Sequence, residues 1–168
     1  MRESHTSVIG LRVFAKENKV EFGTVNEDEI EDMIRKKNND RANMLCEDGQ
    51  IVYNLFVYPA QCNFSGMRFP LSWTQSIKEK FENDSSRVLV LLDAASYVTT
   101  SQLSLKNTKT SPDFVSISFY KMFGYPTGIG ALLVKSELAP ILRKRYFGGG
   151  TGEYIHVVML SDYNTNLG

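Results

Sequence analysis

The chain has 168 residues, of which 42% are hydrophobic and 23% charged, a composition typical of one globular domain. Its 19 basic and 19 acidic residues cancel, which argues against nucleic acid or a membrane surface as a partner. Cys46 and Cys62 form neither a disulfide framework nor a metal-binding spacing, and no secretory leader or long apolar run is present. We therefore expect a cytoplasmic protein without a metal site.

The first part of the chain predicts helices alternating with short strands. Residues 4–17 place apolar side chains on one helical face and are expected to be helical. Residues 20–25 alternate apolar and polar side chains, which indicates a strand. Residues 26–37 open with an Asn-x-x-Glu capping box and predict a second helix. Residues 51–58 are apolar and aromatic, and predict a strand that Pro59 closes.

The second part continues the same alternation. Residues 71–81 predict a helix, with the preceding proline as its first residue. Residues 88–92 are continuously apolar, as strands of a parallel sheet are, and residues 114–120 and 131–134 predict two further strands. Residues 136–144 predict a final helix capped by a serine. The pattern indicates an α/β fold, in which helices cover a sheet.

Two of the predicted strands deliver residues that carry chemistry. The run 87–93 ends in Asp93, and the run 113–121 delivers Lys121 to a turn punctuated by Gly124. Ligands of open α/β sheets bind at the carboxyl ends of the strands. A lone lysine held there by rigid backbone suits a Schiff-base enzyme. A solvated lysine and a turn-capping aspartate are the alternatives.

Five motifs occur in one order along nearly the whole chain. They are SHTSVIG (4–10), PAQCNFSG (59–66), LDAAS (92–96), SFYKMFG (118–124) and FGGGT (147–151). As a set they resemble the class V aminotransferase and cysteine desulfurase family, which depends on pyridoxal 5'-phosphate (PLP), and within it the amino-terminal domain of the eukaryotic molybdenum cofactor sulfurases. The resemblance implies the large-domain sheet of the fold type I PLP-dependent transferases, with helices on both faces. Residues 1–168 would be part of that domain, truncated at both ends.

The resemblance also assigns roles to single residues. Lys121 would attach the PLP aldehyde, and Asp93 would pair with the pyridine nitrogen. His5 would stack on the PLP ring, although a histidine near a helix start also serves as a polar cap. Asn63 would hydrogen-bond near the phenolic oxygen, although Asn-x-x-Gly is also ordinary turn chemistry.

Four further residues match weaker positions of the family pattern. Ser118 would bind the PLP phosphate, and Thr151 would contribute a phosphate contact across a dimer interface, with a flexible turn as the equal alternative. Tyr120 and Ser96 stand where many bacterial relatives carry histidine and glutamine, so detailed desulfurase roles transfer less firmly to them. Cys62 is expected to be structural, because the family's sulfur-carrying thiolate comes from a later loop.

The function implied is PLP-dependent removal of sulfur from L-cysteine and its transfer to the molybdenum cofactor, in a homodimer. Residues 1–168 alone are expected to be inactive. Two alternatives remain open. One is a PLP lyase or aminotransferase of the same fold that acts on another amino acid. The other is a non-catalytic protein that keeps the scaffold.

Overall fold

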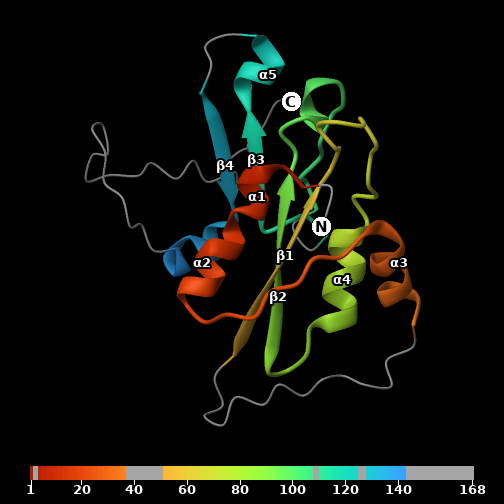
Figure 1. Cartoon of the computed structure of the whole chain (residues 1–168), viewed down its shortest axis with the longest axis vertical. Helices are drawn as coiled ribbons and strands as arrows, with labels where there is room; N and C mark the ends of the chain where they lie inside the picture. Colours follow the sequence, from red (N-terminus) through yellow and green to blue (C-terminus); the bar gives the residue numbers. More distant parts are fainter. Residues whose placement is uncertain (2–3, 37–50, 108–109, 125–127, 143–168) are drawn as a thin grey trace, which may run out of the picture. The chain divides into compact units, whose positions relative to one another are not determined.

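The computed structural model describes residues 1, 4–36, 51–107, 110–124 and 128–142 (Figure 1). The chain divides into two compact units, Met1–Leu133 and Val134–Gly168. Within the described residues no helix is long and apolar enough to cross a membrane.

The first unit is organised by a sheet of four strands. In sequence and in space the order is β1 (Val52–Pro59), β2 (Ser86–Asp93), β3 (Phe114–Ser118) and β4 (Gly130–Val134). β1, β2 and β3 are parallel, whereas β4 runs against β3 (Figure 1). The predicted strands 51–58, 88–92 and 131–134 are therefore present, and the α/β class is confirmed.

Among the described residues, three helices precede β1, and two helices and a 3-10 turn lie between the strands. They are α1 (Thr6–Ile9), α2 (Leu11–Glu17), α3 (Glu27–Arg35), α4 (Trp73–Phe81) and α5 (Phe119–Phe123), with a 3-10 turn η1 (Tyr97–Thr99). The capping box predicted for α3 is present: Asn26 Oδ1 accepts from the Glu29 amide, and the Glu29 carboxylate accepts from the Asn26 amide. The predicted helix 4–17 is interrupted at Gly10, where α1 ends and α2 begins.

The core lies between α4 and one face of the sheet. Val88, Val90 and Leu92 alternate along β2 and point to this face, where they meet Trp73 and Ile77 of α4. All five side chains are buried. At about 25 cal/mol per Å² of apolar surface, burial of each contributes roughly 1.5–3 kcal/mol, so this face fixes which strand residues point inward.

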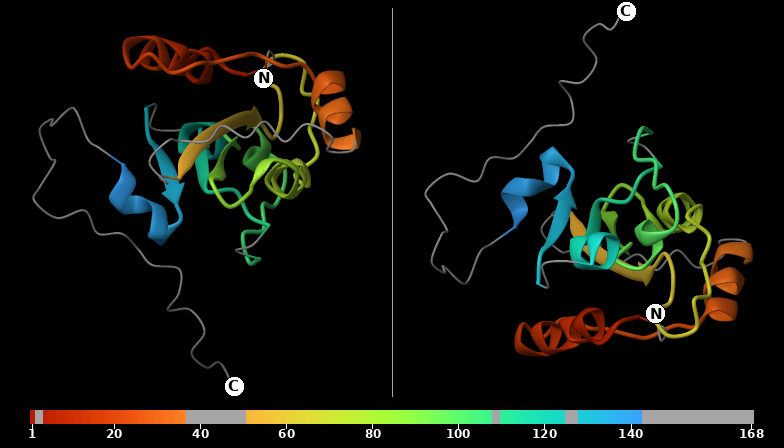
Figure 2. Two further views of the ribbon diagram at one scale, coloured as in Figure 1. Left: turned by 90° about the horizontal axis from the view of Figure 1, so that it is seen from below. Right: turned by 90° about the horizontal axis from the view of Figure 1, so that it is seen from above.

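The opposite face of the sheet is largely open. Tyr53 and Leu55 of β1 are each 52% exposed, and Leu132 of β4 is 54% exposed. α1 and α2 lie on the side of the sheet away from α4 (Figure 2), but none of their residues is buried. Helices thus stand on both sides of the sheet, and of the helices that the structure describes only α4 packs tightly against it.

Three further predicted elements differ from the structure. Residues 20–25 form no strand, because no described strand pairs with them. Pro70 is not the first residue of α4, which begins at Trp73; residues 70–72 form a turn whose Leu71 carbonyl accepts from the Tyr58 hydroxyl at 3.3 Å. The segment predicted as a helix over 136–144 is a 3-10 helix, Ser136–Ile141, which contains Pro140 and is preceded by Lys135 as its cap. Residues 143–144 lie outside the described residues.

The third strand also ends earlier than predicted. β3 stops at Ser118, and the following aromatic residues form the single-turn helix α5. The amide of Phe119 still donates to the Ile129 carbonyl at 3.0 Å, after which the chain leaves the sheet. Gly124 closes α5 with φ +74°, a left-handed conformation that glycine adopts without steric cost. Lys121 therefore lies on a helical turn beyond the strand end.

Candidate functional site

The carboxyl ends of the three parallel strands meet at one edge of the sheet. Pro59 of β1 pairs with Asp93 of β2, and Asp93 pairs with Ser116 of β3. Two backbone hydrogen bonds continue this alignment into the loops: Ala60 N donates to Asp93 O at 2.8 Å, and Ala94 N to Ser116 O at 3.0 Å. The loops that carry the predicted site residues therefore start from a common, rigid edge, where α/β sheets bind ligands.

Asp93 is buried at this edge, with 7% of its surface exposed. Its Oδ1 accepts hydrogen bonds from Ser116 Oγ and from the Ala95 amide, both at 3.1 Å. Both of these hydrogen bonds, from described residues, go to Oδ1 and not to Oδ2. The two donors fix the orientation of the carboxylate.

Lys121 lies beyond the end of β3 and contacts a residue from the loop after β1. Its Nζ donates a hydrogen bond to Asn63 Oδ1 at 2.7 Å. Lys121 is half-buried; of the aromatic residues beside it Phe119 is also half-buried, whereas Tyr120 is 39% exposed and Phe123 72%. The amine is thus held by the Asn63 amide rather than enclosed by apolar rings.

Asn63 is presented by a short hairpin-like loop, residues 60–69. Cys62 N donates to Met67 O at 2.8 Å, and Phe69 N donates to Ala60 O at 3.0 Å. Gly66 N closes the tip by donating to Cys62 O at 3.0 Å. The backbone of the loop is therefore paired with itself, and Cys62 is buried within it.

Arg68 is a residue of this loop that the sequence analysis did not single out. Its Nε donates to Gln61 Oε1 at 3.2 Å, and its NH2 donates to Thr100 Oγ1 at 3.1 Å. Its guanidinium lies 5.5 Å from the centre of the Tyr97 ring, within the range of a cation–π contact. No local sequence pattern predicts the contacts with Thr100 and Tyr97, because they join segments about thirty residues apart.

His5 lies at the start of α1. Its Nδ1 accepts from the Ser7 amide at 3.2 Å and lies 2.8 Å from Ser7 Oγ, so the side chain caps the helix. This is the alternative role that the sequence left open, and the ring is exposed. The segment before it is tied to the end of β1, where the Met1 ammonium donates to Val57 O at 3.3 Å. The stacking role of His5 stays a prediction.

The remaining predicted site residues lie at the end of β3, before η1, on α5 and outside the described residues. Ser118 ends β3 and makes no side-chain cap to α5, and Ser96 immediately precedes η1; both are half-buried. Tyr120 is on the first turn of α5 beside Lys121. Thr151 lies outside the described residues. No group of His, Cys, Asp and Glu that could hold a metal ion occurs in the part of the chain that the structure describes.

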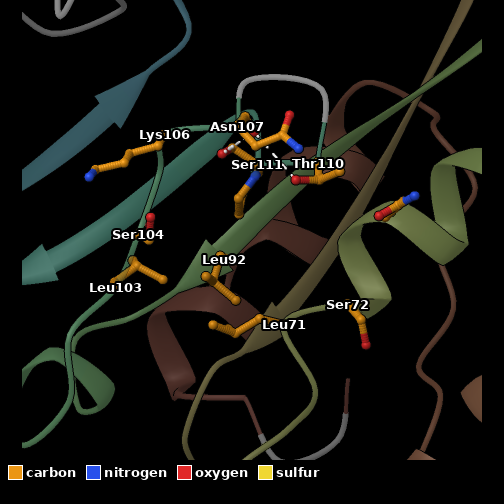
Figure 3. Close-up of a pocket in the computed structure, with 11 residues that line it drawn as sticks. Leu71, Ser72, Leu92, Leu103, Ser104, Lys106, Asn107, Thr110 and Ser111 are labelled. Carbon is orange, nitrogen blue, oxygen red and sulfur yellow. Dashed lines mark hydrogen bonds between the residues drawn. The ribbon is translucent and has the colours of Figure 1, made fainter.

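A cavity of about 340 Å³ lies elsewhere, between residues 103–107 and 110–112 and the start of α4 (Figure 3). Leu71, Leu92, Leu103 and Lys106 are among the residues that line it. None of the residues predicted to bind PLP lines it. The expected convergence of His5, Asn63, Asp93 and Lys121 around one cavity thus stays a prediction, of which the Asn63–Lys121 contact is the part observed.

Comparison with known proteins identifies relatives. Residues 50–166 match the family described as aminotransferase class-V. The chain is 46% identical to human molybdenum cofactor sulfurase over 154 residues and 48% identical to the bovine protein of that name, in each case over 90% of this chain. It is 42% identical to the protein of that name from Bombyx mori over 161 residues. It spans 17% of the length of the human and bovine proteins and 19% of the Bombyx protein.

Proposed function

Because this chain belongs to the class V aminotransferase family, we propose that its strand-end edge binds PLP and that Lys121 is the residue of covalent attachment. The observation that carries the proposal is the hydrogen bond between Lys121 Nζ and Asn63 Oδ1, which brings together two predicted site residues from different loops. Asp93 supports it from the neighbouring strand end, where two hydrogen bonds to Oδ1 fix its carboxylate.

The chemistry of these side chains fits PLP. An amine suits its aldehyde, a buried carboxylate suits its pyridine nitrogen, and an amide suits its phenolic oxygen. Ser118 has a hydroxyl that its helix does not use as a cap, which suits a phosphate oxygen. When bound, PLP supplies an electrophilic carbon for an amine and a ring that withdraws electrons from the α-carbon of an amino acid.

The chain's own residues then have distinct tasks. Asp93, ordered by Ser116 Oγ and the Ala95 amide, holds a proton on the ring nitrogen, because a buried negative charge stabilises a positive partner. Lys121 moves a proton at the substrate α-carbon once its amine is free. Asn63 orients the Lys121 amine through the 2.7 Å hydrogen bond. His5, Ser96, Tyr120 and Thr151 complete the proposed set of contacts with PLP.

The substrate follows from the relatives. The human, bovine and Bombyx proteins are all named molybdenum cofactor sulfurase, and we extend that activity to the protein that contains this chain. Sulfur would leave L-cysteine and reach the molybdenum cofactor through a thiolate nucleophile. Cys62 is a poor candidate for that thiolate, because it is buried within its loop. A homodimer remains part of the proposal.

The test is a map of the attached PLP. The full chain is exposed to PLP, reduced with borohydride and digested, and the pyridoxyl group is located by mass spectrometry. We expect it on Lys121 and expect it to vanish in Lys121→Ala. Lys106→Ala and Lys135→Ala are the matched controls, and both should keep the label. A label on Lys106 or Lys135 in the unaltered chain would refute the assignment.

Product analysis separates the substrates. L-cysteine added to the PLP-loaded form of the longer protein that contains this chain should yield alanine, the carbon product of sulfur removal. A keto acid instead of alanine would indicate a lyase or aminotransferase of the same fold. Binding of PLP to Lys121 without turnover of any amino acid would indicate a scaffold that has lost its catalytic role.

A further inference from the structure

Arg68 joins the loop that carries Asn63 to the segment that follows β2. Within its own loop it contacts Gln61 Oε1, and across the gap between loops it reaches Thr100 Oγ1 and the face of Tyr97. The planar guanidinium of Arg68 thus makes two hydrogen bonds and one ring contact, each with a different residue. The guanidinium is suited to this because its donors form a rigid fork, which a lysine amine lacks.

The segment that Arg68 contacts also touches the helix that bears the lysine. η1, which contains Tyr97, lies against α5, which contains Lys121 (Figure 1). The loop 60–69 therefore meets α5 by two routes: directly, through Asn63, and indirectly, through Arg68 and η1. The distance from the Asn63 loop to Lys121 is set by both.

The direct route is weak without the indirect one. The Asn63–Lys121 contact is exposed, and an exposed polar pair gains little free energy while it restricts two side chains. The base of the loop is anchored to the core, because Ala60, Cys62 and Phe69 are buried and Ala60 N donates to Asp93 O. Arg68 adds side-chain contacts from the loop to Thr100 and Tyr97, as supporting residues do around ligand-binding groups.

We propose that Arg68 is a positioning residue that holds Asn63 against the Lys121 amine through Thr100 and Tyr97. This inference rests on the proposed function of Lys121 and extends it to a residue that has no contact with the amine. It assigns Arg68 to the site rather than to general stability.

The experiment compares two variants that break the bridge at either end. Arg68→Met removes both donors and the ring contact, and Thr100→Val removes one acceptor with little change in volume. Each chain is exposed briefly to PLP and reduced, and the share of pyridoxyl label on Lys121 among all lysines is measured. Arg87→Met is the matched control, because Arg87 donates to the carbonyls of Asn83 and Ser86 at the amino end of β2.

We expect the Lys121 share to fall roughly two- to fivefold in both variants, the change that exposed polar contacts support. Arg87→Met should leave it unchanged. Asn63→Ala should lower the share similarly, and adding Arg68→Met to Asn63→Ala should lower it no further, because the two act on one contact. Hydrogen exchange should quicken in residues 60–69 but not in β2.

Three results would overturn the inference. The share could stay at the wild-type value in both bridge variants. It could fall equally in Arg87→Met, which would make the effect one of stability alone. The Arg68 and Asn63 effects could also add, which would mean that they act separately. Failure of the proposed function looks different, because Lys121 would then carry no label even in the unaltered chain.

Discussion

Asn63 and Lys121 are 58 residues apart in the sequence and are joined by a 2.7 Å hydrogen bond from Nζ to Oδ1. One follows the edge strand β1 and the other follows β3, with β2 between them. The contact exists because β1 and β2 end at paired residues, Pro59 and Asp93, and β3 ends two residues beyond Ser116, the partner of Asp93. The register of the sheet therefore brings these two residues, which are distant in the sequence, into contact.

Replacing Asp93 with asparagine should affect the turnover of L-cysteine but not the attachment of PLP to Lys121. We expect Lys121 to keep its pyridoxyl label, while alanine release from L-cysteine falls at least tenfold, because asparagine cannot hold a proton on the ring nitrogen. Loss of a charged hydrogen bond costs roughly 1.5–3 kcal/mol, which agrees with such a fall. Ser116→Ala is the control: it removes one donor to Asp93 Oδ1 but keeps the carboxylate, and should cost less. Equal loss in both variants would contradict the role of the charge.

Sequence patterns predicted the sheet better than the segments between the strands. Val88, Val90 and Leu92 are apolar because one face of β2 meets α4, and that requirement is visible in the sequence. Residues 20–25 alternate apolar and polar side chains, yet no described strand offers them a partner. The alternation reports which side chains avoid water; whether a strand forms depends on distant neighbours.

Gly130 gives a prediction about the edge that carries the lysine. A Cβ at this position would lie 2.6 Å from the Ile117 carbonyl oxygen, so alanine would push β4 away from β3. We expect Gly130→Ala to lower the free energy of unfolding by roughly 1–3 kcal/mol. Gly23→Ala is the matched control, because nothing lies within 4 Å of its Cβ position, and it should be neutral or slightly stabilising. Urea unfolding of both variants gives the comparison, and equal stabilities would refute the close approach.

In the candidate site too, residues that belong to local sequence motifs could be predicted, whereas contacts between distant segments could not. Lys121 and Asp93 follow strand-like runs, so their motifs could be found in the sequence. Arg68 and the pair Lys78–Asp113 could not, because their contacts cross between elements with no local pattern. The sequence likewise placed Lys121 at a strand end, whereas pairing with β4 ceases at Phe119 and the chain turns into α5.

Asp113 should be a large contributor to stability. It is 3% exposed and forms an ion pair in which Lys78 Nζ lies 2.6 Å from its Oδ2. Its carboxylate also accepts a hydrogen bond from the Val90 amide at 2.8 Å. Asp113→Ala would leave a largely buried ammonium and a buried amide without this partner. We expect the free energy of unfolding to fall by about 3–5 kcal/mol. Glu31→Ala, which breaks the exposed ion pair with Arg35, is the control and should cost less than about 1 kcal/mol. Similar midpoints of urea unfolding for the two variants would show that Asp113 is not critical.

The contribution of Tyr58 to the free energy of unfolding decreases at alkaline pH. Its ring is fully buried, its hydroxyl lies 2.9 Å from Thr74 Oγ1, and burial raises its pKa from 10.0 to about 12. Because the folded state holds this proton more tightly than the unfolded state, the contribution is complete below about pH 10 and is lost as the pH rises to about 12.

The variant Tyr58→Phe isolates this effect. Near pH 8 it should cost about 1–2 kcal/mol, because the Thr74 hydroxyl loses its buried partner. At pH 10.5 the unfolded tyrosine is mostly ionised, and the advantage of the unaltered chain over Tyr58→Phe should shrink by about 0.8 kcal/mol, at 1.36 kcal/mol per pKa unit. Tyr53→Phe, at an exposed position of β1, is the matched control. Urea unfolding at the two pH values measures both differences. If the gap between the unaltered chain and Tyr58→Phe stayed constant from pH 8 to pH 10.5, the buried hydroxyl would not be the group that titrates.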